Sequence, residues 1–338
     1  MECFDRRIML RAHRKRNRRR SGCLPAVLIV SVMAAGCSLG QKAEKFSDEI
    51  KEELVVGVVT KSSTSEYWMS VNSGMEAAAA KNHMEIIFMA PDSEQDRDVQ
   101  EKQVEKLVEQ QVDALAISPI DSYYVPEYME LIQEKNIPVV SFDTGFEECE
   151  LPYIGIDNYK IGYELGKELA RQLDHQGQVG IVSGDLNQMG HRERARGFQD
   201  YIESEPQMTI GFVESGYANM QMSEQKVRML IQGYPQVKGI MATSAVTALG
   251  LADEMKDSGI KIVAVDQQED SMEALEKGEI CALAAQSGYD IGYQTIECIV
   301  KMCRGEEVKM ENHLDAQILT QDNLQAYREA KKDEDQKH

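Results

Sequence analysis

The chain carries two copies of one α/β pattern, and this internal repeat constrains its fold more than any other feature. Short apolar runs alternate with helical patterns of ten to fifteen residues, which is typical of βαβ units with a parallel sheet. The run "NIPVVSFDT" (136–144) corresponds to "GIKIVAVDQ" (259–267), and "VVGVVT" (55–60) corresponds to "QVGIVSG" (178–184). Equivalent positions lie 123–125 residues apart. We therefore predict an α/β protein with two Rossmann-like domains, each built on a parallel sheet.

Each copy of the repeat has an aspartate directly after an apolar strand, at Asp143 and at Asp266. Ligands of open parallel sheets bind beyond the carboxyl ends of the strands. We expect the two carboxylates to face each other across one cleft and to accept hydrogen bonds from a ligand. Removing either one should then weaken binding without preventing folding. The alternative is that each aspartate caps the turn or helix that follows its strand.

Residues 1–36 have the composition of a secretory signal. Nine basic residues between Arg6 and Arg20 precede an apolar stretch that is too short to span a membrane. The run "AAGC" (34–37) resembles the bacterial lipobox, so we expect Cys37 to carry a diacylglycerol group and to begin the mature chain. The alternatives are a signal anchor that stays uncut and a cysteine that stands at this position by coincidence. We assign residues 37–53 to a polar tether and residues 326–338 to a polar tail that frays.

The proposed mature chain is long enough for two domains and is strongly acidic. Removing the nine basic and two acidic residues of the signal changes the formal charge from −20 to −27. Such a surface repels phosphate backbones, so we expect no nucleic-acid partner. The sequence contains no His-Glu-x-x-His motif, no Gly-x-Ser-x-Gly motif and no calcium loop of the EF-hand type. We therefore predict that the protein is not an enzyme and binds neither a cofactor nor a metal.

Four cysteines follow Cys37, and their spacing indicates no metal site. They include no Cys-x-x-Cys pair and no pairing with histidines at metal-ligand spacing. We interpret all four as buried small hydrophobic residues, and the sequence leaves one disulfide among them open. These residues are Cys149, Cys281, Cys298 and Cys303.

Three segments carry a resemblance to a known family: "YIGIDNYKIGYELGKELA" (153–170), "HRERARGF" (191–198) and "AQSGYDIGYQTIECIVKMCRGE" (285–306). They are similar to solute-binding proteins of bacterial ABC transporters, specifically to the ribose/galactose-binding cluster with the type I periplasmic-binding-protein fold. The resemblance covers nearly all of residues 54–325. It implies two lobes joined by three hinge segments, near Asp157, Ser287 and Asp315.

The resemblance also implies the lobe boundaries and the function. The N-terminal lobe would comprise residues 54–157 and 287–314, and the C-terminal lobe residues 158–286 and 315–325. The protein would be a monomeric, lipid-anchored extracytoplasmic receptor that captures a small polar ligand, with a sugar as the expected class. It would deliver this ligand to an ABC permease. The alternative is a sensory receptor on the same fold that signals to a membrane histidine kinase.

The pocket residues follow from the resemblance one position at a time. The loop after the first strand would bring aromatic side chains to the apolar face of a sugar ring, and an arginine would donate hydrogen bonds to hydroxyls. For Trp68 the alternative is packing at the start of a helix, and for Arg192 it is surface pairing with an acid such as Glu193. The expected ligand-binding residues are Ser65, Tyr67, Trp68, Ser118, Asp143, Arg192, Ser244, Asp266 and Gln286.

Several positions depart from the family pattern. Thr144 stands where family members commonly have an arginine, Ser118 replaces a common asparagine, and Ser244-Ala245 replaces a common Asn-Asp pair. Because buried hydroxyls need matching donors and acceptors, these changes suggest a ligand that is smaller, less hydroxylated or differently shaped than a pentose or hexose. Asp92, in the polar loop 91–98, is expected to lie outside the site.

Overall fold

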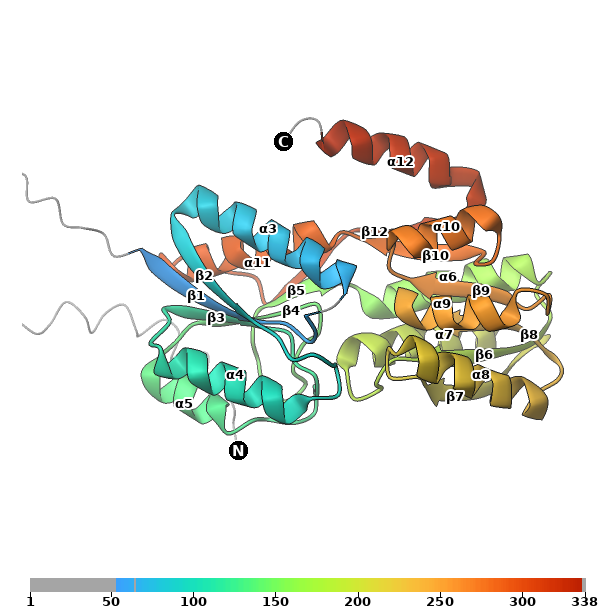
Figure 1. Ribbon diagram of the computed structural model, residues 1–338, viewed down its shortest axis with the longest axis horizontal. Helices are drawn as coiled ribbons and strands as arrows, with labels where there is room; N and C mark the ends of the chain where they lie inside the picture. The colour runs from blue at the N-terminus through green and yellow to red at the C-terminus, as the bar shows by residue number, and fades with distance from the viewer. Residues whose placement is uncertain (1–52, 64, 336–338) are drawn as a thin grey trace, which may run out of the picture.

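The computed structural model describes residues 53–63 and 65–335, and it contains two lobes that lie side by side (Figure 1). Within these residues each lobe is built on a sheet of six strands with helices packed against it. The predicted fold class, two α/β domains with parallel sheets, is therefore confirmed. The proposed signal sequence, the lipidation site Cys37 and the tether up to residue 52 lie outside the described residues.

The first lobe has strand order β11-β5-β4-β3-β1-β2, and all neighbouring strands are parallel. Its elements are β1 (Leu54–Val59), α3 (Glu66–Asn82), β2 (Met84–Met89), α4 (Arg97–Glu109), β3 (Ala114–Ile117), α5 (Tyr128–Lys135), β4 (Val139–Phe142), β5 (Tyr153–Ile156), α11 (Gly288–Cys303) and β11 (Glu311–Leu314).

The second lobe repeats this arrangement with strand order β12-β10-β9-β8-β6-β7, in which only β12 runs antiparallel to its neighbour. Its elements are α6 (Asn158–Gln172), β6 (Gly177–Ser183), α7 (Met189–Ser204), β7 (Met208–Ser215), α8 (Met220–Gly233), β8 (Val237–Ala242), α9 (Ala245–Met255), β9 (Lys261–Val265), α10 (Glu269–Lys277), β10 (Ala282–Gln286), β12 (Ala316–Leu319) and α12 (Gln321–Asp335).

The chain passes between the two sheets after β5, after β10 and between β11 and β12. Two of these crossings are fixed by helix N-caps: Asp157 accepts a hydrogen bond from the Lys160 N–H, and Ser287 accepts one from the Asp290 N–H. Asp315 alone separates β11 from β12. These crossings coincide with the segments at which the sequence places hinges; that they bend stays a prediction.

Each lobe has a close helix pair, α3 with α11 in the first lobe and α6 with α7 in the second, and glycines allow the contact. In the second lobe, a Cβ added at Gly162 on α6 would lie 2.0 Å from the backbone oxygen of Arg194 on α7. A Cβ at Gly197 would lie 2.0 Å from the backbone oxygen of Tyr159. Only glycine permits this approach, so the sequence of α6 fixes the position of α7 and of the side chains that α7 carries.

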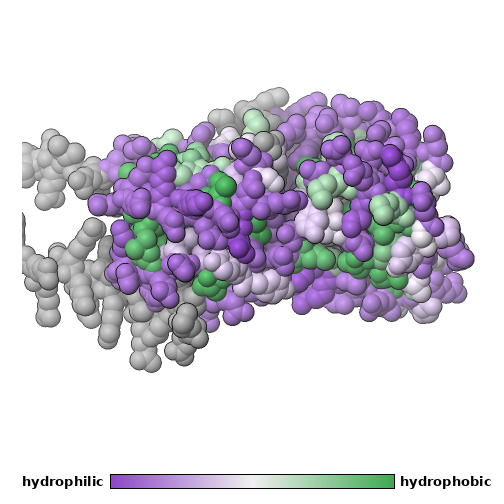
Figure 2. Space-filling model, turned by 60° about the horizontal axis from the view of Figure 1, so that its bottom comes forward, coloured by the Kyte–Doolittle hydropathy of each residue, from purple (hydrophilic) through white to green (hydrophobic). Residues whose placement is uncertain are grey.

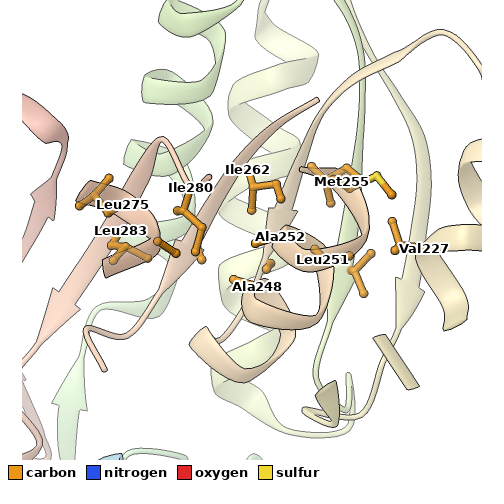
Figure 3. Close-up of a cluster of buried hydrophobic side chains, with 14 of the residues drawn as sticks. Val227, Ala248, Leu251, Ala252, Met255, Ile262, Leu275, Ile280 and Leu283 are labelled. Atoms are coloured by element: carbon orange, nitrogen blue, oxygen red, sulfur yellow. The ribbon is translucent and has the colours of Figure 1, made fainter. Parts of the chain in front are cut away.

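Each sheet is covered by apolar side chains on both faces. Figure 3 shows one such cluster, in which α8, α9 and α10 contribute residues that pack against the strands of the second sheet. Complete burial of a Leu or Ile side chain contributes about 1.5–3 kcal/mol, so these clusters hold the strand ends in place. The residues labelled there are Val227, Ala248, Leu251, Ala252, Met255, Ile262, Leu275, Ile280 and Leu283.

The C-terminal segment differs from the prediction of a fraying tail. Helix α12 continues from Gln321 to Asp335. Leu324 is 5% exposed and Tyr327 packs against the core of the second lobe. Arg328 forms ion pairs with Glu269 and Glu276 of α10. The apolar contacts and these pairs give the polar helix a docking face that its composition does not reveal.

The remaining surface is mostly hydrophilic, with scattered apolar patches on the face drawn in Figure 2. None of the helices in residues 53–63 and 65–335 is long and apolar enough to cross a bilayer. In that same part of the chain, Cys149, Cys281, Cys298 and Cys303 form no disulfide, which resolves the alternative that the sequence leaves open.

Candidate functional site

A cavity of about 430 Å³ lies between the two lobes at the carboxyl ends of their strands. Asp143 follows β4 of the first lobe and Asp266 follows β9 of the second, and both line the cavity. The Asp143 carboxylate is also one of the groups that raise the pKa of Asp266. The repeat thus brings the two strand-end aspartates together, as the sequence predicts.

Both aspartates adopt a left-handed backbone conformation, with φ of 59° at Asp143 and 81° at Asp266. Asp is one of the few non-glycine residues that tolerates this region. The Asp143 carboxylate accepts hydrogen bonds from the Tyr67 hydroxyl, at 2.7 Å, and the Thr144 hydroxyl, at 3.0 Å. The Asp266 carboxylate accepts one from Gln286 Nε2 at 2.5 Å. The side chains therefore bond to the cavity wall instead of capping the turns that follow.

A buried lysine neutralises Asp143. Lys61 Nζ lies 3.0 Å from Asp143 Oδ2 and donates hydrogen bonds to Thr144 Oγ1 at 2.9 Å and Gln188 Oε1 at 2.7 Å. Burial alone would raise the pKa of Asp143, but Lys61, the Arg194 guanidinium and the hydrogen bonds lower that pKa to about 2. Asp143 is therefore charged at neutral pH and presents acceptors to the cavity.

Asp266 has a different electrostatic environment. Burial raises the pKa of Asp266 above its usual value, and this effect outweighs the opposing influence of Arg194 and the Gln286 hydrogen bond. Gln286 is 2% exposed, and its Oε1 has no hydrogen-bond partner among the described residues. An unpaired buried acceptor costs about 1–3 kcal/mol. This corner of the cavity therefore favours a ligand that supplies hydrogen-bond donors.

The aromatic wall comes from the start of α3. Ser65 is the N-cap of this helix and accepts a hydrogen bond from the Tyr67 N–H, which directs the next residues into the cavity. The Tyr67 and Trp68 rings are 5.1 Å apart in an edge-on arrangement. Trp68 is 2% exposed and its Nε1 donates to Glu94 Oε1 at 3.4 Å. Ser65, Tyr67 and Trp68 all line the cavity, and Trp68 also packs at the start of its helix; contact between its ring and a ligand stays a prediction.

The arginine of the cavity is Arg194 and not Arg192. Arg192 lies outside the lining; it pairs with Glu147 and stacks on Tyr123 at 4.1 Å. Arg194 lines the cavity, is 5% exposed, and donates to Asn158 Oδ1 at 2.7 Å and to the Thr243 backbone oxygen at 2.8 Å. Arg192 does not reach the cavity because a step of two residues along a helix turns the side chain to the opposite side of the helix.

The helix periodicity contains a signal that identifies the correct arginine. His191, Arg194 and Phe198 are at positions i, i+3 and i+7 of α7 and are all buried. His191 also lines the cavity, and burial lowers its pKa well below the usual value, so the ring is neutral at pH 7. Its Nδ1 lies 2.8 Å from Thr243 Oγ1.

The two serines that replace common family residues occupy different places. Ser244 lines the cavity and is the N-cap of α9. Ser118 is fully buried beneath Asp143, with its hydroxyl 3.5 Å from Asp143 Oδ2, and does not line the cavity.

Sequence reasoning misses two parts of the wall. Lys61 lies in a polar loop that looks solvent-exposed in the sequence, yet it is 4% exposed. Asp92, expected outside the site, lines the cavity together with Ser93, Glu94 and Gln95. In the described part of the chain, no cluster of three or more His, Cys, Asp or Glu side chains is arranged to hold a metal ion.

Comparison with known proteins agrees with this architecture. The chain is 26% identical to the ribose import binding protein RbsB of Bacillus subtilis over 282 residues, which covers 82% of this chain and 91% of the relative. It is 24% identical to a D-ribose/D-allose-binding protein of Pseudomonas aeruginosa, covering 84% and 93% of the two chains. The crystal structure of GanP, a glucose-galactose binding protein from Geobacillus stearothermophilus, matches with a TM-score of 0.76 at 24% identity, covering 81% and 99%.

A family model described as a periplasmic binding protein domain matches residues 56–307. This range includes both strand-end aspartates, two of the three crossings, and both sheets except for the edge strands β11 and β12 and the first two residues of β1. The chain therefore belongs to the periplasmic binding protein domain family.

Proposed function

We propose that this protein is an extracytoplasmic receptor that captures a small polar ligand, of the sugar or polyol class, between its two lobes and delivers it to an ABC permease. The observation that carries this proposal is the inter-lobe cavity lined by Asp143 and Asp266 together with Arg194. Acceptors and donors on both sides of one cavity match hydroxyl groups, which donate and accept at the same atom.

The charge distribution supports a neutral, hydroxylated ligand. The family position next to Asp143 that commonly holds an arginine is Thr144 here, and Lys61 from the first loop supplies a cation at the same carboxylate. Asp143 accepts from the ligand on the first-lobe side, and Asp266 and Gln286 accept from it on the second-lobe side. The apolar face of a sugar ring would lie against Trp68.

The names of the relatives point to the same ligand class. The relatives in Bacillus and Pseudomonas are named for ribose and allose, and a solute-binding protein from Bacillus halodurans was solved with bound myo-inositol, with a TM-score of 0.73 to this chain. The proposed receptor is a monomer whose signal is cut before Cys37 and which is anchored to the membrane by a lipid on that cysteine. Its lobes close on the ligand by bending at the crossings near Asp157, Ser287 and Asp315.

A thermal-shift screen tests the function. The purified protein without its signal is melted alone and with D-ribose, D-allose, D-arabinose, D-galactose or myo-inositol at millimolar concentration. A ligand at a hundred times its Kd stabilises the folded form by about 2.7 kcal/mol. We expect at least one sugar or polyol to raise the melting temperature by several degrees. Absence of a shift with every hydroxylated compound, combined with a shift from an amino acid or peptide, would overturn the sugar class.

A further inference from the structure

One short segment of the second lobe, residues 187–192, makes a set of contacts with the first lobe. The Ser122 N–H donates to the Asn187 backbone oxygen at 3.0 Å, and the Met189 N–H donates to Ser122 Oγ at 2.8 Å. Arg192 adds its ion pair with Glu147. We call residues 187–192 the clasp segment. It lies at the start of α7, the same helix that carries Arg194 into the cavity.

Gln188 is the centre of the clasp segment. It is the N-cap residue of α7 but makes no side-chain capping hydrogen bond. Instead its side chain, fully buried, reaches into the first lobe. Its Oε1 accepts from Lys61 Nζ at 2.7 Å, and its Nε2 donates to Glu94 Oε2 at 3.1 Å. A cation on one side of the amide and a carboxylate on the other fix its orientation.

The partners of Gln188 belong to the wall of the ligand cavity, although Gln188 itself does not line it. Lys61 is the cation paired with Asp143, and Glu94 accepts the Trp68 indole hydrogen bond. Within residues 53–63 and 65–335, three crossing segments link the lobes covalently. When the lobes separate by bending at these segments, both Gln188 bonds break together because donor and acceptor lie in different lobes.

We propose that Gln188 is a closure latch: by bridging Lys61 and Glu94 it stabilises the closed arrangement of the lobes and holds Asp143 and Trp68 in position for the ligand. It is a positioning residue that acts through the cavity wall. The proposal rests on separation of the lobes and is independent of which ligand is bound. Because a ligand binds the closed form, a latch that populates this form before binding raises apparent affinity.

Hydrogen exchange of the protein without ligand tests the latch directly. The amide protons of Ser122 and Met189 are bonded across the lobe boundary, so opening exposes them to solvent. The Gly184 amide, which donates to Thr243 Oγ1 at 2.9 Å inside the second lobe, is the matched control. In the parent protein we expect all three to exchange more slowly than an unstructured peptide. Exchange of Ser122 and Met189 at the unstructured rate would overturn the proposal.

Variants at Gln188 isolate its two hydrogen bonds. Gln188→Met keeps the length and volume of the side chain and removes both bonds. Because each is a bond to a charged group, we expect at least tenfold faster exchange at Ser122 and Met189, with Gly184 unchanged. Exchange rates equal to the parent at both amides would show that Gln188 does not hold the lobes together.

A reciprocal exchange of side chains completes the test. Gln188→Glu alone places two carboxylates against each other and should speed exchange in the same way. The double variant Gln188→Glu with Glu94→Gln restores a donor opposite an acceptor and leaves Lys61 beside a carboxylate, so protection should return. If the Gly184 amide also exchanges faster in Gln188→Met, that variant is unfolding, and the double variant becomes the deciding measurement. If the double variant does not restore the protection of the Ser122 and Met189 amides, the proposed bridge is wrong. A thermal-shift screen without hits would leave these rates unaffected, so the two proposals fail independently.

Discussion

Lys61 Nζ lies 3.0 Å from Asp143 Oδ2, and the two side chains are 6% and 7% exposed. This buried pair joins the loop after the first strand to the end of the fourth strand, 82 residues later in the chain. Because both side chains lie away from solvent, water does not replace either partner of the pair. The pair therefore gives a structural role to Asp143, the carboxylate that we propose as a ligand contact.

Removing the charge of Asp143 should destabilise the protein, which adds a stability cost to the expectation from sequence that folding survives this change. Asp143→Asn leaves Lys61 buried without its counter-ion, and breaking a buried pair costs about 3–5 kcal/mol. We expect a matching loss in urea unfolding and loss of sugar binding. The double variant with Lys61→Met should recover much of the stability but not the binding. Asp253→Asn, on an exposed position of α9, is the control and should change neither.

The same pair predicts a pH dependence. The pKa of Asp143 in the folded protein, about 2, lies below its ordinary value of 3.8. Its contribution to stability is therefore present above pH 3.8 and is lost as the pH falls toward 2. Over that interval the unfolding free energy of the parent should fall more steeply than that of Asp143→Asn. Parallel curves for the two proteins would contradict the assignment.

For Asp266 we expect the opposite dependence of stability on pH. Its folded-state pKa is raised, so its charge costs stability, and this cost appears as the pH rises through the folded pKa. In Asp266→Asn the new amide can donate to the unpaired Gln286 Oε1. We expect the ligand-free variant to melt about 1–4 °C higher than the parent at pH 7 and to bind sugar more weakly. The difference in melting temperature between Asp266→Asn and the parent should be smaller at pH 4. If the variant melts below the parent at pH 7, the buried charge of Asp266 does not cost stability.

Arg194 and Arg196 offer a matched comparison on one helix. Arg194→Lys cannot reproduce two directed donors to Asn158 and Thr243, so we expect sugar affinity to fall about tenfold or more. Arg196 is 59% exposed and pairs with Glu193, so Arg196→Lys should bind like the parent. Isothermal titration with the sugar found by thermal shift measures both. If the two variants bind the sugar with equal affinity, Arg194 does not contribute to ligand binding.

Trp68 provides an intrinsic optical probe, because it is the single tryptophan in the chain. Its ring lines the cavity, and its Nε1 bonds to Glu94. Sugar binding should therefore change the tryptophan emission, and titration of that change should give the calorimetric Kd. Glu94→Gln should shift the emission of the free protein. An emission that stays constant at saturating sugar would place the ligand away from Trp68.

The lipid anchor is tested at Cys37. A thioether-linked diacylglycerol supplies two acyl chains, enough for stable attachment where one is marginal. We expect Cys37→Ser to move the protein from the membrane fraction to the soluble fraction, or to leave the signal uncut. Cys281→Ser, in the second lobe, should fractionate like the parent. Unchanged partitioning and migration of Cys37→Ser would count against lipidation.

The sequence repeat predicts both sheets and both strand-end aspartates because these depend on local patterns that recur at one offset. Lys61 is not predictable in this way. One of its hydrogen-bond partners is Gln188, which is 127 residues away and in the other lobe. Arg192 and Arg194 show a second limit, since the family motif contains both and only the helical phase, set by packing on α6, decides which one enters the cavity.

The left-handed backbone at Asp143 and Asp266 also limits how the protein can be re-engineered. With φ of 59° and 81°, these positions accept Asp, Asn or Gly at little cost and exclude β-branched side chains. A library that randomises them fully would consist mostly of strained, poorly expressed members. Diversity aimed at a new ligand preference belongs at positions with extended backbone, such as Ser244 at φ −153°, where Ser, Thr, Asp and Asn all preserve the N-cap of α9 without backbone strain.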